Sequence, residues 1–170
     1  DATFGLGLSA TAVGLVMLPG MVANGAFAPA AGALMRRTTP ARVLLVGLLA
    51  CALGGLGLAL EHSEAWQLAL GFGIVGMGWA FVVTASPRIV SDAVPPEQTG
   101  ITNGLNSTSR ISGTLLGGQI AVAILVGTAI TAGVPSDRGF TLCFALTAVA
   151  GFAAAALAVG IRSPQHSSAS

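Results

Sequence analysis

One stretch decides the fold class: VLLVGLLACALGGLGLAL, which runs from Val43 to Leu60 for eighteen residues without a single charge. A helix needs about 20 apolar residues to cross roughly 30 Å of hydrocarbon, and this stretch comes close to that length. Four more apolar stretches, separated by short polar joints, lie at about 8–34, 66–90, 101–131 and 140–161. The sequence therefore predicts an all-α fold, a polytopic bundle of five membrane-spanning helices.

Composition supports the membrane class. Of the 170 residues, 54% are hydrophobic and only 8% are charged, whereas a soluble domain has about 25% charged residues. Tyr is absent and aromatic residues make up 5%, so the material for the aromatic girdles of a membrane barrel is lacking. The net charge of +1 provides no basic field for nucleic acid, so no nucleic-acid partner is expected.

The domain organisation is predicted to be simple. Residues 1–163 form the transmembrane bundle, and residues 164–170 form a polar, Ser-rich, disordered tail. The chain begins at Asp1 without Met, a basic leader or a small-residue cleavage site, so we expect it to be a piece of a longer polypeptide.

Charge placement predicts the orientation. Five crossings put the joints at 36–42 and 88–97 and the C-terminus on one side of the membrane. That side carries five arginines: Arg36, Arg37, Arg42, Arg88 and Arg162. The other side carries only Arg138. By the positive-inside rule the arginine-rich side is cytoplasmic, which predicts a multi-pass protein of the cell membrane with a cytoplasmic C-terminus.

Two segments resemble a known family. The joint from Gly32 to Arg42 resembles the loop signature G-x-L-x-D-R-x-G-x-R-R of the major facilitator superfamily. The matching residues are Gly32, Leu34, Arg37 and Arg42, while Arg36 stands in place of Asp and Thr39 in place of Gly. The segment 94–113 is similar to the one that opens the penultimate helix of the fourteen-helix drug:proton antiporter branch. It carries Val94-Pro95, Gly100, Gly104, Arg110 and Gly113. The run from Leu15 to Gly20, which reads LVMLPG, resembles the L-L-P-G helix of that branch.

The resemblance implies that the chain is most of the C-terminal half of a multidrug efflux transporter, whose N-terminal half is missing here. Such proteins export small lipophilic compounds by rocking two halves around a midplane site, with protons entering in exchange. The first and fourth helices would lie between the halves, the third at the central cavity, and the second and fifth against lipid. The alternative is a membrane scaffold or assembly module that transports nothing. A channel is a third option, but no filter ring or charged pore stripe is seen.

Six residues are candidates for a substrate cavity or for contact between the halves: Asn24, Trp79, Thr84, Asn103, Asn106 and Arg110. Asn103, Asn106 and Arg110 recur at i, i+3 and i+7 and share one helix face, which predicts a polar wall. The alternative for Arg110 is that its side chain reaches the cytoplasmic surface. Asn24 either faces a cavity or forms a hydrogen bond with a neighbouring helix. Trp79 and Thr84 either line the cavity or pack against lipid and other helices.

Two glycine patterns each allow two interpretations. Gly71-Phe-Gly-Ile-Val-Gly76 spells G-x-G-x-x-G, but it lies inside an apolar helix with no preceding strand, so it predicts close helix approach and not dinucleotide binding. Gly113-x-x-x-Gly117 predicts packing within the bundle in preference to dimerisation. Cys51 and Cys143 lie in apolar stretches and are interpreted as small packing residues.

The sequence predicts no enzyme, no cofactor and no metal site. His62 and His166 have no Cys or carboxylates clustered around them that would complete a set of metal ligands. All six acidic residues lie in or beside the joints. A proton-coupled transporter needs a titratable group within the membrane. If the parent uses protons, we expect its titrating groups in the missing part.

Overall fold

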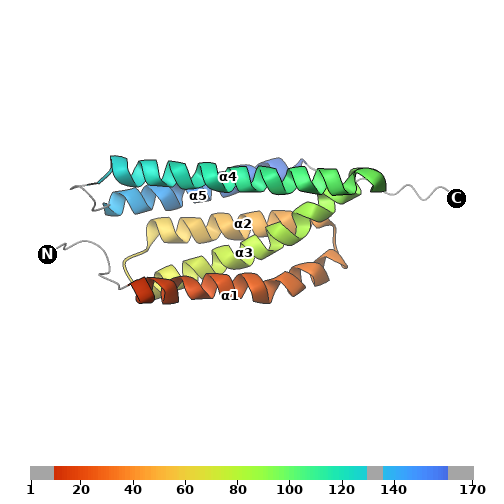
Figure 1. Cartoon of the computed structure of the whole chain (residues 1–170). Coiled ribbons are helices and arrows are strands. Elements are labelled where there is room, and N and C mark those ends of the chain that lie inside the picture. Colours follow the sequence, from red (N-terminus) through yellow and green to blue (C-terminus); the bar gives the residue numbers. More distant parts are fainter. Residues whose placement is uncertain (1–9, 130–135, 161–170) are drawn as a thin grey trace.

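A computed structural model describes residues 10–129 and 136–160. Within these ranges the chain is helical and contains no strand, which confirms the predicted all-α class. The helices are α1 (Ala10–Met35), α2 (Pro40–Leu60), α3 (Ala65–Asp92), the short 3-10 helix η1 (Pro96–Gln98), α4 (Thr99–Gly127) and α5 (Asp137–Val159) (Figure 1). The five α-helices are long and apolar enough to cross a membrane.

Local chemistry explains where the helices begin. Pro40 opens α2, a position where its missing N–H costs no helical hydrogen bond. At the start of α3, the Glu64 N–H donates to Gln67 Oε1 at 3.0 Å as part of a capping box. At the start of α5, the Ser136 hydroxyl accepts from the Gly139 N–H at 3.2 Å. These polar first turns lie outside the apolar stretches, so helices α2, α3 and α5 begin one to three residues earlier than expected.

The end of α4 differs from the expectation of residue 131. The helix ends at Gly127, and Thr128 caps it, with its backbone N–H and its hydroxyl both donating to the Ile124 carbonyl. Residues 130 and 131 lie outside the described ranges. So do the expected start of the first helix at residue 8, the tail at 164–170, Arg162 and His166.

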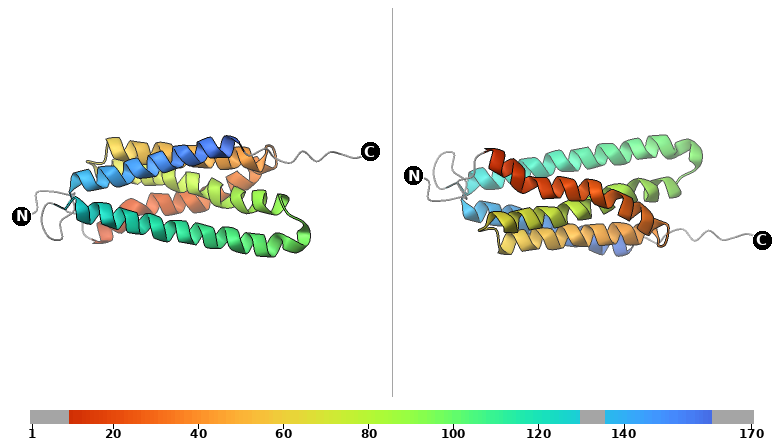
Figure 2. Two further views of the ribbon diagram at one scale, coloured as in Figure 1. Left: turned by 90° about the horizontal axis from the view of Figure 1, so that it is seen from above. Right: turned by 90° about the horizontal axis from the view of Figure 1, so that it is seen from below.

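The joints alternate between two ends of the bundle. The α1–α2 turn and the α3–α4 joint lie at one end, and the α2–α3 turn and the start of α5 lie at the other (Figures 1 and 2). We call the first the arginine-rich end, defined by Arg36, Arg37, Arg42 and Arg88. We call the second the acidic end, defined by Glu61, Glu64 and Asp137. This is the pairing of joints that five crossings predict.

Close glycine contacts hold four helices together, with α3 between α1 and α2, and α2 between α3 and α5. A Cβ built on Gly47 of α2 would lie 2.7 Å from the Gly78 carbonyl oxygen of α3. A Cβ built on Gly151 of α5 would lie 2.9 Å from the Ala52 Cβ. Gly71 and Gly76 of α3 meet Leu58 and the Gly20 backbone just as closely. The interpretation of Gly71, Gly76 and Gly78 as sites of helix approach is thereby confirmed, whereas a Cβ at Gly73 would meet only Pro19, at an ordinary contact distance of 3.9 Å.

Helix α4 is packed differently. It touches α3 through its first turns and α5 through its last, and every residue from 108 to 120 is exposed (Figure 2). A Cβ at Gly113 or Gly117 would meet no heavy atom of the described chain within 4 Å. The expectation that this G-x-x-x-G packs within the bundle is therefore wrong for the described residues, because no helix lies near the middle of α4.

Candidate functional site

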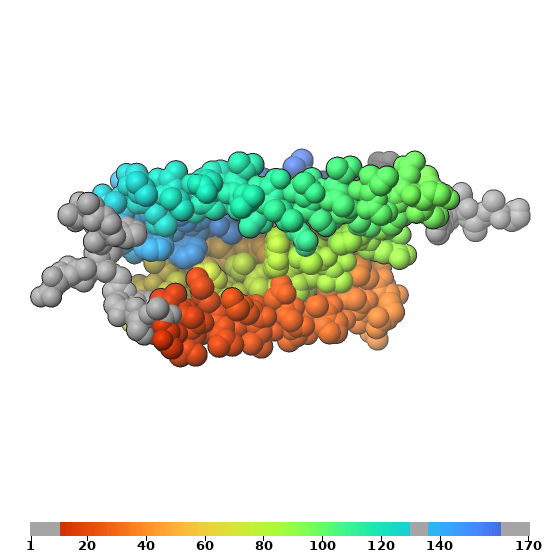
Figure 3. Space-filling model, viewed as in Figure 1, coloured from red at the N-terminus to blue at the C-terminus, as the bar shows by residue number. Residues whose placement is uncertain are grey.

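One face of the bundle is hollowed. In Figure 3 the yellow-green surface of α3 lies recessed between α1, in red and orange, and α4, in green. Two open grooves run along this recess, one between α1 and α3 and the other between α3 and α4. Trp79 lines both grooves and is 42% exposed. The recess is therefore one connected surface, with an indole ring where its two parts meet.

The α1–α3 groove is mainly apolar and has a volume of about 470 Å³. It is lined by Met17, Gly20, Met21, Asn24, Phe72, Val75, Gly76 and Trp79. The crossing at Gly20 and Gly76 brings the two backbones into contact, so larger side chains on either side of the crossing form the walls. Half of the lining residues are methionines or aromatic residues, and Asn24 supplies the one side-chain amide.

The α3–α4 groove is smaller and more polar, with a volume of about 230 Å³. It is lined by Trp79, Val82, Val83, Ser86, Pro87, Asn106, Ser109 and Arg110. Pro87 lies inside α3 and has no N–H, so the Val83 carbonyl lacks its usual helical donor. The side chains that line this groove supply a guanidinium, two hydroxyls and an amide.

Three of the predicted residues lie deep along their helices. Asn24 is eleven residues from the end of α1, Trp79 thirteen from the end of α3, and Arg110 eleven from the start of α4. At 1.5 Å per residue, these positions are about 16–20 Å from the arginine-rich end. The three helices are 26, 28 and 29 residues long, so all three residues lie roughly two fifths of the way along their helices from that end.

Asn24 and Arg110 share a second property. Neither side chain makes a hydrogen bond or ion pair with any residue in 10–129 or 136–160. The hydrogen bond to a neighbouring helix that was the alternative for Asn24 is not found in this part of the chain. Both polar groups instead line open grooves, where they are available to a ligand or to another polypeptide segment.

The other two asparagines join α4 to α3. Asn103 Nδ2 donates to Ser91 Oγ at 2.8 Å, and the Ser86 hydroxyl donates to Asn106 Oδ1 at 3.1 Å. Asn106 also lines the α3–α4 groove, whereas Asn103 does not. The predicted polar face of α4 thus serves partly as a helix contact. Ser86 and Ser91 were missed in the sequence, because an isolated hydroxyl in an apolar helix does not reveal its partner.

Thr84 stands apart from the other candidates. Its hydroxyl donates to the Ala80 carbonyl at 2.7 Å, within its own helix. It lines neither groove of the recess.

The loop-signature residues lie at the arginine-rich end. Leu34 packs against the buried cluster of Ala31, Val43 and Ala85, and its carbonyl accepts the Thr38 hydroxyl at 2.9 Å. The other three members are Gly32, which lines a third groove of about 410 Å³, and the exposed residues Arg37 and Arg42. Arg36, which stands where the signature has Asp, lines the same groove as Arg88 and Asp92. Arg88 pairs with Asp92 at 3.1 Å, and Asp92 of α3 is the only carboxylate among the described residues that line this groove.

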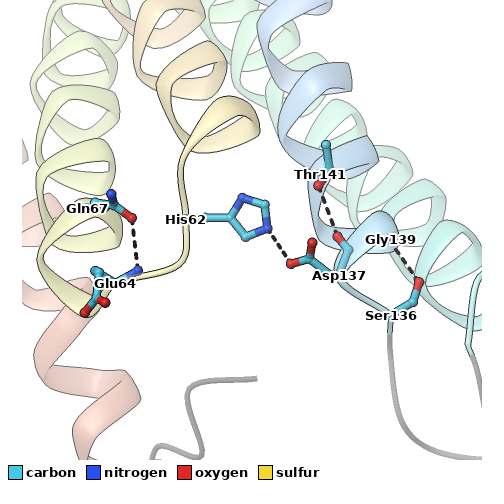
Figure 4. A network of polar contacts seen from close by, with 7 residues as sticks. All are labelled: His62, Glu64, Gln67, Ser136, Asp137, Gly139 and Thr141. Carbon is cyan, nitrogen blue, oxygen red and sulfur yellow. Dashed lines mark hydrogen bonds and ion pairs between the residues drawn. The ribbon is translucent and has the colours of Figure 1, made fainter. Parts of the chain in front are cut away.

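A network of polar contacts lies at the acidic end (Figure 4). His62, in the α2–α3 turn, approaches Asp137 at the start of α5, with 2.8 Å between Nε2 and Oδ1. The His62 ring also packs edge-on against Phe144, with ring centroids 5.8 Å apart. Phe144 meets Phe72 in the same manner at 6.4 Å, and Phe72 lines the α1–α3 groove. This aromatic series connects the acidic end to the recess.

The comparison with protein families agrees with this arrangement. The family model of the Major Facilitator Superfamily matches residues 2–170. The chain belongs to the major facilitator superfamily. The resemblance found in the loop and the 94–113 segment is thereby confirmed, and the chain is a multi-pass membrane protein of a transporter family.

Curated relatives carry names that mention resistance and export. The chain is 30% identical over 120 residues to the "Multidrug resistance protein Stp" of Mycobacterium tuberculosis (strain CDC 1551 / Oshkosh), a match covering 70% of the chain and 22% of Stp. It is 30% identical over 123 residues to the "Tetracenomycin C resistance and export protein" of Streptomyces glaucescens, again covering 70% and 22%. This major facilitator chain thus spans about a fifth of the length of these relatives. No solved structure matches it.

Proposed function

We propose that this chain supplies five helices of the C-terminal half of a major facilitator drug exporter of the fourteen-helix type. The transporter would move small lipophilic compounds out of the cell by alternating access and would use protons as the coupling ion. The names of the two relatives, both of which mention resistance, support a drug exporter. The arginine-rich end would face the cytoplasm, as the positive-inside rule predicts.

The observation that carries the proposal is the mid-depth recess. Trp79 joins an apolar groove to a polar one, and Asn24 and Arg110 line these grooves about halfway across the membrane. Secondary transporters bind their substrates near the bilayer midplane, between repeated units that move against each other. The remaining polypeptide of such a transporter would close the recess from the open side shown in Figure 3.

Proton coupling would depend on groups outside the described helices. The described carboxylates are Glu61, Glu64, Asp92, Glu97 and Asp137, and all lie within a turn of a helix end. A proton-carrying group must be within the membrane to alternate between the two sides. We therefore propose that the titrating residues belong to the rest of the transporter. Asp92→Asn and Glu97→Gln should leave proton exchange in place, and complete loss of coupling from either change would contradict this.

The test of the proposed function is efflux by the complete transporter in a drug-susceptible bacterial host. Trp79→Ala should reduce the export of a neutral lipophilic dye such as Nile red, with unchanged amounts of protein in the membrane. The matched control is Leu53→Ala on α2, since Leu53 is 57% exposed and lines neither groove. If the wild-type protein exports no compound tested while remaining folded in the membrane, the result favours a scaffold.

A further inference from the structure

Arg110 is an unusual charge in this chain. Every other charged residue in 10–129 and 136–160 lies in a joint or within about one turn of a helix end, whereas Arg110 is eleven residues inside α4. A cation at this depth is costly unless it faces water or an opposite charge. The groove that Arg110 lines has an opening for solvent, but no carboxylate among its lining residues.

The nearest carboxylates on the described helices do not neutralise the charge of Arg110. Asp92 is at the arginine-rich end of α3 and is already paired with Arg88. Glu97 is in η1, thirteen residues before Arg110 and before α4 begins. The groups next to Arg110 in the groove are neutral donors and acceptors, from Ser86, Asn106 and Ser109. The polar end of the recess is therefore cationic and supplied with hydrogen-bonding groups.

The rest of the recess suits a flat apolar body. Trp79 presents its indole to both grooves, and the α1–α3 groove beyond it contains Phe72 and two flexible methionines, Met17 and Met21. Its volume of about 470 Å³ is within the range of about 300–1,000 Å³ found for small-molecule sites. Aromatic rings gain both buried area and favourable ring geometry against such walls.

We infer that the recess binds amphiphilic organic anions, with the acidic group at Arg110 and an aromatic body along Trp79 into the α1–α3 groove. A guanidinium pairs with a carboxylate or sulfonate through two parallel hydrogen bonds, which also fixes the orientation of the ligand. This inference rests on the proposed function and adds the charge class of the substrate. A carboxylate from the remaining polypeptide could provide the same counter-charge, and the experiment separates these two sources.

The experiment uses the complete transporter, purified in lipid nanodiscs, and three probes that share one ring system. Naphthoate is anionic, naphthamide is neutral and naphthylmethylamine is cationic at neutral pH. Isothermal calorimetry measures the dissociation constant of each. Naphthoate should bind about tenfold or more tightly than naphthamide, as expected for a hydrogen bond to a charged group inside a protein. The cationic probe should bind weakest of the three.

Variants locate the selectivity. Arg110→Gln should bring the ratio of naphthoate to naphthamide affinity close to one, and Arg110→Lys should retain part of it. Trp79→Ala should weaken both probes by a similar factor and leave the ratio unchanged. If Arg110→Gln does not fold, the three probes on the wild-type protein still decide the question, because they need no variant.

Two results would overturn the inference. Equal binding of naphthoate and naphthamide to the wild-type protein would mean that a carboxylate of the transporter already neutralises Arg110. A preference for naphthoate that survives Arg110→Gln would place the anion elsewhere. Nile red efflux, measured separately, tests the proposed function. Efflux of this neutral dye without any preference for anions would refute the inference alone, whereas absence of efflux of every compound tested, Nile red and naphthoate included, would refute the proposed function.

Discussion

The substitution Gly76→Ala tests how the recess is built. A Cβ at position 76 would collide with the carbonyl oxygen, the carbonyl carbon and the Cα of Gly20, and since all three are backbone atoms, no side chain can rotate away. Helix α1 must therefore move off α3. Overpacking of this kind typically costs about 1–3 kcal/mol, while the better helix propensity of Ala returns at most about 1 kcal/mol. We expect a net loss of about 1–2 kcal/mol in the free energy of unfolding.

The control is Gly57→Ala, an identical substitution in α2 at a position where a Cβ would meet nothing within 4 Å. It should leave the stability unchanged or raise it by up to about 1 kcal/mol. Thermal unfolding of the detergent-purified complete transporter, followed by fluorescence-detected size exclusion, would compare the two variants. Gly76→Ala should also reduce Nile red efflux, because Gly20 and Gly76 both line the α1–α3 groove. A melting temperature for Gly76→Ala equal to that of Gly57→Ala would refute the close crossing of α1 and α3.

Three further predictions address other parts of the chain. Asp137→Asn should lower the free energy of unfolding by less than about 1 kcal/mol, as expected for a partly exposed ion pair. A double-mutant cycle with His62→Ala should show that the two side chains interact, and additive effects of the two substitutions would contradict the contact in Figure 4. Ser86→Ala removes the hydroxyl that bonds α4 and should cost about 0.6 kcal/mol, the average for such bonds in membranes; an unchanged melting temperature would place α4 elsewhere. A membrane-impermeant maleimide should label Ser63→Cys in intact cells and Ala93→Cys only after permeabilisation, since these exposed positions lie at opposite ends; the reverse pattern would invert the orientation.

The helices could be predicted from the sequence because lipid imposes a strong rule. Every backbone polar group within the hydrocarbon must find a partner inside its own segment, so a long apolar stretch is a helix. Helix ends follow a different rule, set by single polar contacts. The observed helix ends differ from the expected ones by a few residues at Glu64, Ser136 and Thr128, where polar groups cap the helices. The length of an apolar stretch contains no information about such caps.

The candidate site was only partly predictable. Asn24, Trp79 and Arg110 could be selected from the sequence, because polar and amphipathic groups at mid-helix are rare in membrane segments. That Trp79 lies between two grooves could not, since this depends on how three helices cross. Thr84 could not be assigned from the sequence, because a hydroxyl that bonds within its own helix gives the same sequence pattern as one facing a cavity.

Glycine placement on α3 explains why the recess stays open. Helices in lipid associate mainly where small residues let their backbones approach. Gly71, Gly76 and Gly78 are turned toward α1 and α2, and those helices lie in close contact with α3. The face toward α4 consists of Trp79, Val82, Val83 and Ser86, at i, i+3, i+4 and i+7, and contains no glycine. These bulky side chains keep the α4 backbone away from the α3 backbone, and two serine–asparagine hydrogen bonds join the two helices. Within the described residues α4 is thus attached near its two ends, to α3 and to α5, whereas α1, α2, α3 and α5 make far more extensive contacts with one another.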